Sequence, residues 1–170
     1  MKIAVLNVTF QLKPTLEPLG TEQAICVFEE AGFETLFYAS SLHGAFDDEF
    51  AVRVMACDGV MFAGISNVRD ILDQFYERRD EIASALRAKG YEGFIVATGH
   101  QASLRPEEPL AACSAIDAVI VGDPDAAARE MVDRLQKGTP LKGVVRPELV
   151  SSAAQPQPAS AWQQHGYVDI

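Results

Sequence analysis

The residues best suited to bind a cofactor lie in three short segments, each of which follows a hydrophobic run. These segments are residues 64–67 (GISN), 98–103 (TGHQAS) and 122–125 (GDPD). Each combines glycine with small polar side chains. Glycine lets the backbone turn without a Cβ clash and lets a bulky ligand approach the main chain closely. The pattern therefore predicts three loops that form one shared binding floor.

The elements expected to position these loops are five hydrophobic runs, separated by segments with helical periodicity. The runs are residues 2–8, 34–38, 58–63, 93–97 and 118–121. Alternating strands and helices with short connections predict an α/β fold with a parallel sheet. We expect a flavodoxin-like or Rossmann-like three-layer sandwich with five parallel strands in the order 2-1-3-4-5. In such a sheet the three loops would meet at the carboxyl ends of the strands, near the point where the strand order reverses.

Capping residues and apolar stripes mark the expected helices, which are residues 19–31, 47–56, 68–89, a short helix after residue 106, and residues 124–137. The last helix has the clearest signals. Asp123 is a favourable N-cap, Pro124 fits the first helical position, and Gly138 is a favourable terminator. Beyond Gly143 the pattern of strands and helices is lost.

The charge balance excludes some classes of partner. The chain has 24 acidic and 14 basic residues, a net charge of -10, and its basic residues are scattered. Nucleic-acid binding needs clustered lysine and arginine, so we expect no nucleic-acid partner. The same balance argues against an anionic membrane surface. Because no signal peptide or membrane span is evident, we expect a cytoplasmic protein.

Several other chemistries fit the sequence poorly. The cysteines Cys26, Cys57 and Cys113 are far apart and form no CxxC pair. Zinc or iron–sulfur ligation by this chain alone is therefore not expected, and the cysteines are interpreted as free thiols. A phospho-receiver site would need an acidic cluster after the first strand, and a flavin site would need a compact Ser/Thr/Gly-rich turn there. Residues 7–14 (NVTFQLKP) provide neither, so we expect neither kind of site in this sequence. A nucleotide phosphate at the last helix would be repelled by Asp123 and Asp125.

Four segments together resemble the cobalamin (vitamin B12)-binding domain that precedes the catalytic barrel of cobalamin-dependent radical S-adenosylmethionine enzymes. They are residues 18–20 (PLG), 64–66 (GIS), 99–108 (GHQASLRPEE) and 116–123 (IDAVIVGD), and the resemblance covers roughly residues 1–145. It implies a module that holds cobalamin for a radical S-adenosylmethionine methyltransferase. The metal would be the cobalt of the cofactor, and this chain alone would not be catalytic. The alternative is a non-enzymatic flavodoxin-like regulatory or scaffold domain without a cofactor.

The resemblance also implies which residues contact cobalamin. Ser66 and Asn67 would lie beside its dimethylbenzimidazole tail, and the slot around the tail would be walled by Gly99, His100, Gln101 and Ala102. Gly122, Asp123 and Pro124 would lie against the corrin edge. Four further residues next to these segments are candidate contacts: Leu19, Gly20, Val68 and Thr98. Small residues at these places would leave the clearance that a flat macrocycle with a long tail requires.

One departure from related cobalamin domains concerns cobalt. Domains of the methionine-synthase and mutase type carry Asp-x-His-x-x-Gly after the first strand, whereas residues 9–20 contain no histidine. We therefore expect base-off cobalamin without a protein histidine ligand. Thr9, Phe10 and Arg69 are the candidates for the surface under cobalt. His100 is expected to be a loop histidine rather than a ligand.

The carboxyl-terminal segment differs in composition from the rest of the chain. Residues 151–161 are rich in Ser, Ala, Gln and Pro, which is typical of a linker. Residues 167–170 look like the beginning of another strand. We therefore expect a domain at residues 1–145, and a linker with the start of a further domain at residues 146–170. The resemblance places the iron–sulfur cluster and S-adenosylmethionine in that downstream radical S-adenosylmethionine domain.

Overall fold

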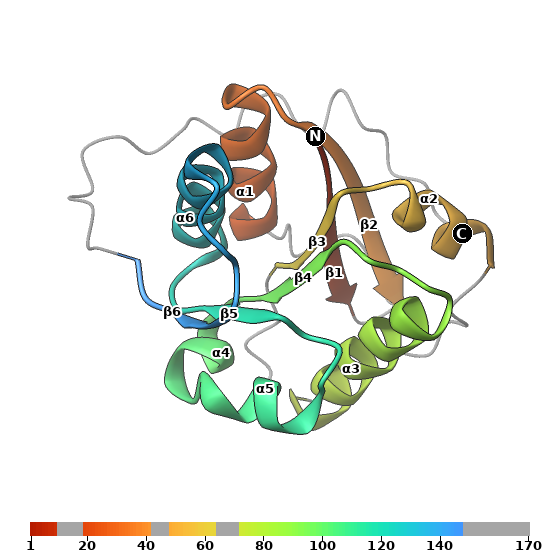
Figure 1. Cartoon of the computed structure of the whole chain (residues 1–170). Helices are drawn as coiled ribbons and strands as arrows, with labels where there is room; N and C mark the ends of the chain where they lie inside the picture. Colours follow the sequence, from red (N-terminus) through yellow and green to blue (C-terminus); the bar gives the residue numbers. More distant parts are fainter. Residues whose placement is uncertain (10–18, 42–47, 64–71, 148–170) are drawn as a thin grey trace.

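The structure is a computed structural model that describes residues 1–9, 19–41, 48–63 and 72–147. In these residues one parallel sheet of six strands runs through the centre of the molecule, in the order β2-β1-β3-β4-β5-β6 (Figure 1). Its strands are β1 (Lys2–Thr9), β2 (Glu34–Ser41), β3 (Gly59–Phe62), β4 (Phe94–Ala97), β5 (Ala118–Ile120) and β6 (Gly143–Val145). The strand order reverses at β1, which has β2 on one side and β3 on the other.

Six helices are described, namely α1 (Leu19–Glu30), α2 (Asp48–Met55), α3 (Leu72–Ala88), α4 (His100–Leu104), α5 (Glu107–Ala112) and α6 (Pro124–Lys137). Two hydrophobic clusters show which face of the sheet each helix covers. Helices α1 and α6 pack over the face that carries Ile3, Val5 and Met61. The other face, with Leu6 and Phe62, is covered by α2 and α3 together with residues of α4 and α5. The fold is therefore a three-layer sandwich.

Burial on both faces explains why the strands are continuous hydrophobic runs. All four residues of β3 are buried, as are all three of β5. Parallel strands between two helical layers have no solvent-facing side, so they lose the alternation of polar and apolar residues. No helix in the described ranges combines the length and the apolar character needed to cross a membrane.

The α/β class and the order 2-1-3-4-5 are confirmed, but the prediction of five strands is wrong. A sixth strand, β6, pairs in parallel with β5, and the backbone N–H of Val121 donates to the carbonyl oxygen of Val145 at 2.9 Å. The segment offers only two apolar residues, Val144 and Val145, which is too short a hydrophobic run to predict a strand. It forms because β5 offers an unpaired edge and because Val145, only 3% exposed, completes the core.

The helices also differ in how well local signals predict them. Helix α6 runs from Pro124 to Lys137, with Asp123 as N-cap and Gly138 in the left-handed conformation at its end, as expected. Helix α3 is followed by Gly90 at φ +87°, the expected left-handed stop. The short helix α4 occupies residues that the sequence pattern places in a loop.

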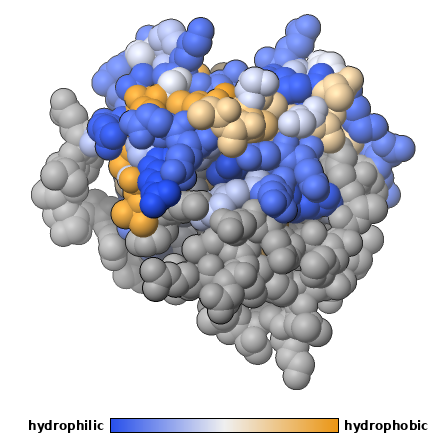
Figure 2. Space-filling model, turned by 90° about the horizontal axis from the view of Figure 1, so that it is seen from below, coloured by the Kyte–Doolittle hydropathy of each residue, from blue (hydrophilic) through white to orange (hydrophobic). Residues whose placement is uncertain are grey.

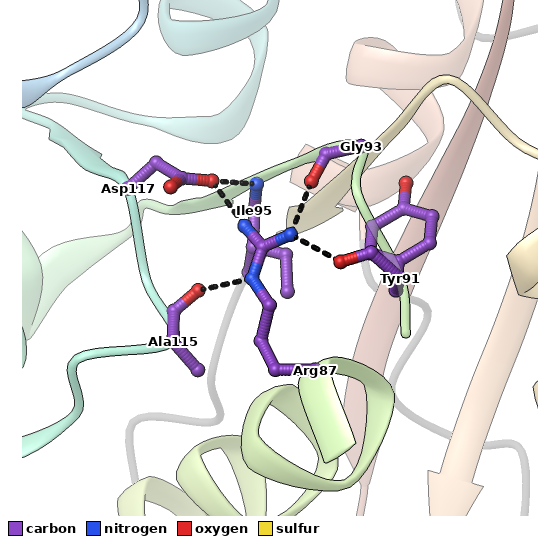
Figure 3. Close-up of polar contacts among 6 residues, drawn as sticks. All are labelled: Arg87, Tyr91, Gly93, Ile95, Ala115 and Asp117. Atoms are coloured by element: carbon purple, nitrogen blue, oxygen red, sulfur yellow. Dashed lines mark hydrogen bonds and ion pairs between the residues drawn. The ribbon is translucent and has the colours of Figure 1, made fainter. Parts of the chain in front are cut away.

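At the edge where the strands begin, the side chain of Arg87 links helix α3 to the sheet (Figure 3). Arg87, in the last turn of α3, donates to the carbonyl oxygens of Tyr91 and Gly93 and forms an ion pair with Asp117 at 2.6 Å. The Asp117 carboxylate also accepts the backbone N–H of Ile95 at 2.7 Å. These contacts join α3 to the beginnings of β4 and β5, far from the carboxyl ends of the strands.

Candidate functional site

The described residues that were predicted to bind the cofactor come together at the carboxyl edge of the sheet. Thr9 ends β1, Leu19 and Gly20 begin α1, and Thr98 and Gly99 follow β4. His100, Gln101 and Ala102 form the first residues of α4, and Gly122, Asp123 and Pro124 connect β5 to α6. Phe10, Ser66, Asn67, Val68 and Arg69 lie outside the described residues.

Two hydroxyl groups tie the loop after β4 to the loop after β5. The Thr98 hydroxyl lies 2.9 Å from the carbonyl oxygen of Ile120 and 3.1 Å from that of Gly122, and it can donate to either. The Ser103 hydroxyl accepts the backbone N–H of Gly122 at 2.8 Å and can donate to the carbonyl oxygen of Gly99 at 2.8 Å. The two loops therefore form one hydrogen-bonded unit.

Both glycines of this unit have a backbone that other residues rarely adopt. The φ angle is +105° at Gly99 and +130° at Gly122. A side chain at either position would be strained. At Gly122 a Cβ atom would lie 3.6 Å from the Cβ of Ala126, which is an ordinary contact, so the backbone conformation is what requires glycine there.

The beginning of α1 is attached to the same edge. The Thr21 hydroxyl donates to the carbonyl oxygen of Ala63, directly after β3, at 3.1 Å. A Cβ atom at Gly20 would lie only 3.1 Å from Cγ of Pro124, so the first turns of α1 and α6 are in close contact. The edge thus joins the ends of β3, β4 and β5 to the beginnings of two helices.

Exposure divides the predicted contacts into two groups. Thr98, Gly99, Ala102 and Pro124 are buried, whereas Gly20 and Gly122 are partly exposed and Asp123 is exposed.

Figure 2 views the molecule from below, which is the side toward which β1 and β2 point in Figure 1. Hydrophilic side chains there border a band of more hydrophobic surface. On α4, Leu104 is 67% exposed.

The hydroxyl groups change the chemical character of the edge. The end of a parallel strand normally presents carbonyl oxygens, which would attract a cation or a strong hydrogen-bond donor. Here the carbonyl oxygens of Ala63, Gly99 and Gly122 each have a threonine or serine hydroxyl within hydrogen-bonding distance. The described part of the edge therefore suits a broad ligand that lies against a surface of satisfied backbone.

The electrostatics of the described residues offer no activated nucleophile among the cysteines. Cys26, Cys57 and Cys113 are buried free thiols. Burial raises the pKa of Cys26 and of Cys57 above the ordinary thiol value, which disfavours the reactive thiolate. No group of three or more His, Cys, Asp or Glu side chains that could hold a metal ion is found in the described ranges.

Among the described residues, Asp123 places a charged side chain at this edge, between β5 and α6. It is the N-cap residue of α6, with extended backbone, but its side chain makes no capping hydrogen bond. Its carboxylate is therefore not committed to the helix that it precedes. A carboxylate near a helix N-terminus is stabilised by the helix dipole and can accept hydrogen bonds from neutral amide groups of a ligand.

Thr21 lies outside the segments that the sequence pattern singles out, and Ser103 belongs to the segment 98–103 but is given no contact of its own there. Each lies in the first or second turn of a helix, and each bonds to a strand tip that is distant in sequence, 42 positions away for Thr21 and Ala63 and 19 for Ser103 and Gly122. The only local signal is a hydroxyl residue shortly after a helix start. That signal is too common to indicate a site.

Comparison with known proteins adds information on the fold. No family model matches the chain. The uncharacterized methyltransferase PH0819 of Pyrococcus horikoshii is 38% identical over 52 residues, which are 31% of this chain and 11% of that protein.

Two structures of the radical S-adenosylmethionine methyltransferase TsrM from Kitasatospora setae resemble the chain, each with a TM-score of 0.57. One contains tryptophan substrate and the S-adenosylmethionine analogue aza-SAM, and the other contains cobalamin and a 4Fe-4S cluster. Identity is 17% and 18%, over 81% of this chain. The chain spans only 26% and 25% of the TsrM chains. At this identity the likeness shows that the chain has a Rossmann-like α/β fold.

Proposed function

We propose that the chain is a cobalamin-binding module that serves a radical S-adenosylmethionine methyltransferase. The observation that carries this proposal is the fold shared over 81% of the chain with TsrM, a methyltransferase whose structure contains cobalamin. The local identity with the methyltransferase PH0819 supports the same class of enzyme. Because the chain spans a small part of either protein, its own role is binding and positioning rather than the complete reaction.

The carboxyl edge of the sheet fits such a ligand. Gly122, which follows β5, brings backbone to the partly exposed surface without a side chain, and hydroxyl groups lie within hydrogen-bonding distance of the nearby carbonyl oxygens. A flat macrocycle with a long tail needs such clearance and does not need strong acceptors beneath it. When bound there, cobalamin would supply methyl-transfer chemistry.

We assign the predicted contact residues to this edge as part of the proposal. Gly20, Gly122 and Asp123 reach the surface, so they would touch the ligand directly, with the Asp123 carboxylate accepting hydrogen bonds from neutral amides of the corrin. Buried Thr98 and Ala102 would set the shape of the floor from below. The remaining predicted contacts, on residues 9–10, 19, 66–69, 99–101 and 124, complete the proposed site.

The proposal includes the state of cobalt and the organisation of the whole protein. Cobalamin would bind base-off and without a protein histidine ligand, since residues 9–20 contain no histidine. Residues 1–145 would form the binding domain. Residues 146–170 would lead into a downstream domain that holds an iron–sulfur cluster and S-adenosylmethionine.

Retention of hydroxocobalamin tests the proposal. The chain is incubated with hydroxocobalamin and separated by gel filtration, and the visible spectrum of the protein peak is recorded. We expect a coloured protein peak with a base-off spectrum that is unchanged in a His100→Ala variant. A colourless protein peak would refute the proposal and favour the scaffold alternative, and a spectrum altered by His100→Ala would refute the absence of histidine ligation.

A matched pair of glycine variants locates the site. Gly122→Ala introduces strain at φ +130° on the proposed floor, and Gly32→Ala introduces strain at φ +82° in the turn after α1. Both should lower stability, but only Gly122→Ala should weaken hydroxocobalamin binding, by roughly tenfold or more. Equal effects of the two variants on binding would contradict a site at the carboxyl edge.

A further inference from the structure

We infer that Ser103 is a positioning residue, whose hydroxyl group holds the loop after β4 and the loop after β5 in one fixed arrangement for the ligand. The inference rests on the proposed function for the identity of that ligand. The contact between the loops is a property of the chain itself and can be tested separately.

The geometry places one hydroxyl between two loops. Ser103 lies in α4, and its Oγ accepts the backbone N–H of Gly122 at 2.8 Å. The same Oγ can donate its proton to the carbonyl oxygen of Gly99 at 2.8 Å, with the carbonyl oxygen of Gly122 as a longer alternative at 3.3 Å. The backbone N–H of Ser103 also donates to the carbonyl oxygen of Gly99 at 3.0 Å, which holds the serine in place.

The loops need this restraint because both contain glycine at the point of contact. Glycine loses more conformational freedom on folding than any other residue, and it readily adopts other backbone angles when it is not held. Without the Ser103 contact, the N–H of Gly122 would have to find water, and of the two described hydroxyl contacts between the loops only that of Thr98 would remain. A ligand lying across both loops would then have to order them on binding, which weakens affinity.

Ser103 is a better subject for a test than Thr98, which ties the same loops. Thr98 is only 4% exposed, so its replacement disturbs the core between β4 and β5. Ser103 is half-buried, so Ser103→Ala removes the bridging hydroxyl and leaves the core intact. Ser103→Thr keeps a hydroxyl at the same position and serves as the conservative variant.

The matched control removes a comparable hydrogen bond at the amino ends of the strands, on the side of the sheet opposite to the two loops. The Thr35 hydroxyl, at the beginning of β2, donates to Oε1 of Glu29 at 2.6 Å, and this contact is also partly buried. Thr35→Val therefore lowers stability through the loss of one hydroxyl contact without touching the two loops.

Two measurements on the full chain test the inference. Hydrogen exchange of the Gly122 amide, followed by NMR, should be about tenfold faster in Ser103→Ala than in the parent, and close to the parent rate in Ser103→Thr. The dissociation constant for hydroxocobalamin should rise by about tenfold in Ser103→Ala only. A tenfold change corresponds to about 1.4 kcal/mol, the order expected for one net hydrogen bond.

The outcomes separate this inference from the proposed function. If the Gly122 amide exchanges at the parent rate in Ser103→Ala, or if Thr35→Val accelerates it equally, the inference is overturned whether or not cobalamin binds. If the parent does not bind hydroxocobalamin, the proposed function and the ligand-positioning role of Ser103 both fail, while the exchange rate still decides whether the hydroxyl couples the loops.

Discussion

Replacing Arg87 with methionine should destabilise the chain by about 3 kcal/mol. The guanidinium group donates to the carbonyl oxygens of Tyr91 at 2.6 Å and Gly93 at 2.8 Å, and it pairs with the Asp117 carboxylate at 2.6 Å (Figure 3). A fourth contact, from Nε to the carbonyl oxygen of Ala115, is longer at 3.4 Å. Methionine keeps the apolar stem of the side chain and removes all four contacts.

The magnitude follows from the three short contacts. A hydrogen bond from a charged group contributes about 1.5–3 kcal/mol when water is excluded. The side chain of Arg87 is 27% exposed and that of Asp117 is 38% exposed, so water can partly replace the lost contacts. We therefore assign about 1 kcal/mol to each short contact. Arg87→Lys should lose about 2 kcal/mol, because an ammonium group cannot reproduce the fork of a guanidinium.

Urea unfolding at pH 7, followed by circular dichroism, measures these differences. The matched control is Arg105→Met, which removes an ion pair with Glu108 whose two side chains are 71% and 56% exposed. That variant should remain within about 0.5 kcal/mol of the parent. If Arg87→Met were no more destabilised than Arg105→Met, the conclusion that Arg87 stabilises the contact between α3 and the sheet would be wrong.

Three further variants test contacts on β4 and its connections. Tyr91→Phe should raise stability by about 1 kcal/mol, because the buried hydroxyl has no partner among the described residues. Burial raises the pKa of Tyr91, so the parent should lose stability as the pH rises above about 10, and urea midpoints at pH 8 and pH 10.5 should differ less in Tyr91→Phe. Gly93→Ala should lower stability by about 2–4 kcal/mol, since a Cβ atom would overlap the Tyr91 hydroxyl and lie 2.6 Å from the carbonyl oxygen of Asp58. An unchanged melting temperature would contradict that packing. Thr98→Val should cost about 1–2 kcal/mol in urea unfolding, because the carbonyl oxygens of Ile120 and Gly122 lose the hydroxyl that can donate to either, and a neutral effect would show that water replaces it.

Local signals were sufficient for most of the fold. The hydrophobic runs that became β1, β3, β4 and β5 are continuous because both faces of the sheet are covered, and this makes them recognisable without any knowledge of their neighbours. The boundaries of α6 follow from Pro124 and Gly138, whose preferred backbone angles suit those positions by themselves. Alternation of the two element types then leaves few possible strand orders.

The same local signals predicted only part of the candidate site. The glycine-containing segments after β4 and β5 do meet at one edge, as the topology requires. The pattern could not show that Thr98 and Ala102 face the interior, because the exposure of a residue at a strand tip depends on how the following helix packs. The segment after β3 lies outside the described residues, so its place at the edge stays a prediction.

By itself, therefore, the sequence determined the α/β class, the order of five strands and the position of the glycines that end two of them. Only the tertiary structure decided that β6 joins the sheet and that Ser103 holds Gly122, 19 positions away. The physical reason is that periodicity and backbone preference act between neighbouring residues. An unpaired strand edge or a bridging hydroxyl acquires its partner only when distant segments pack together.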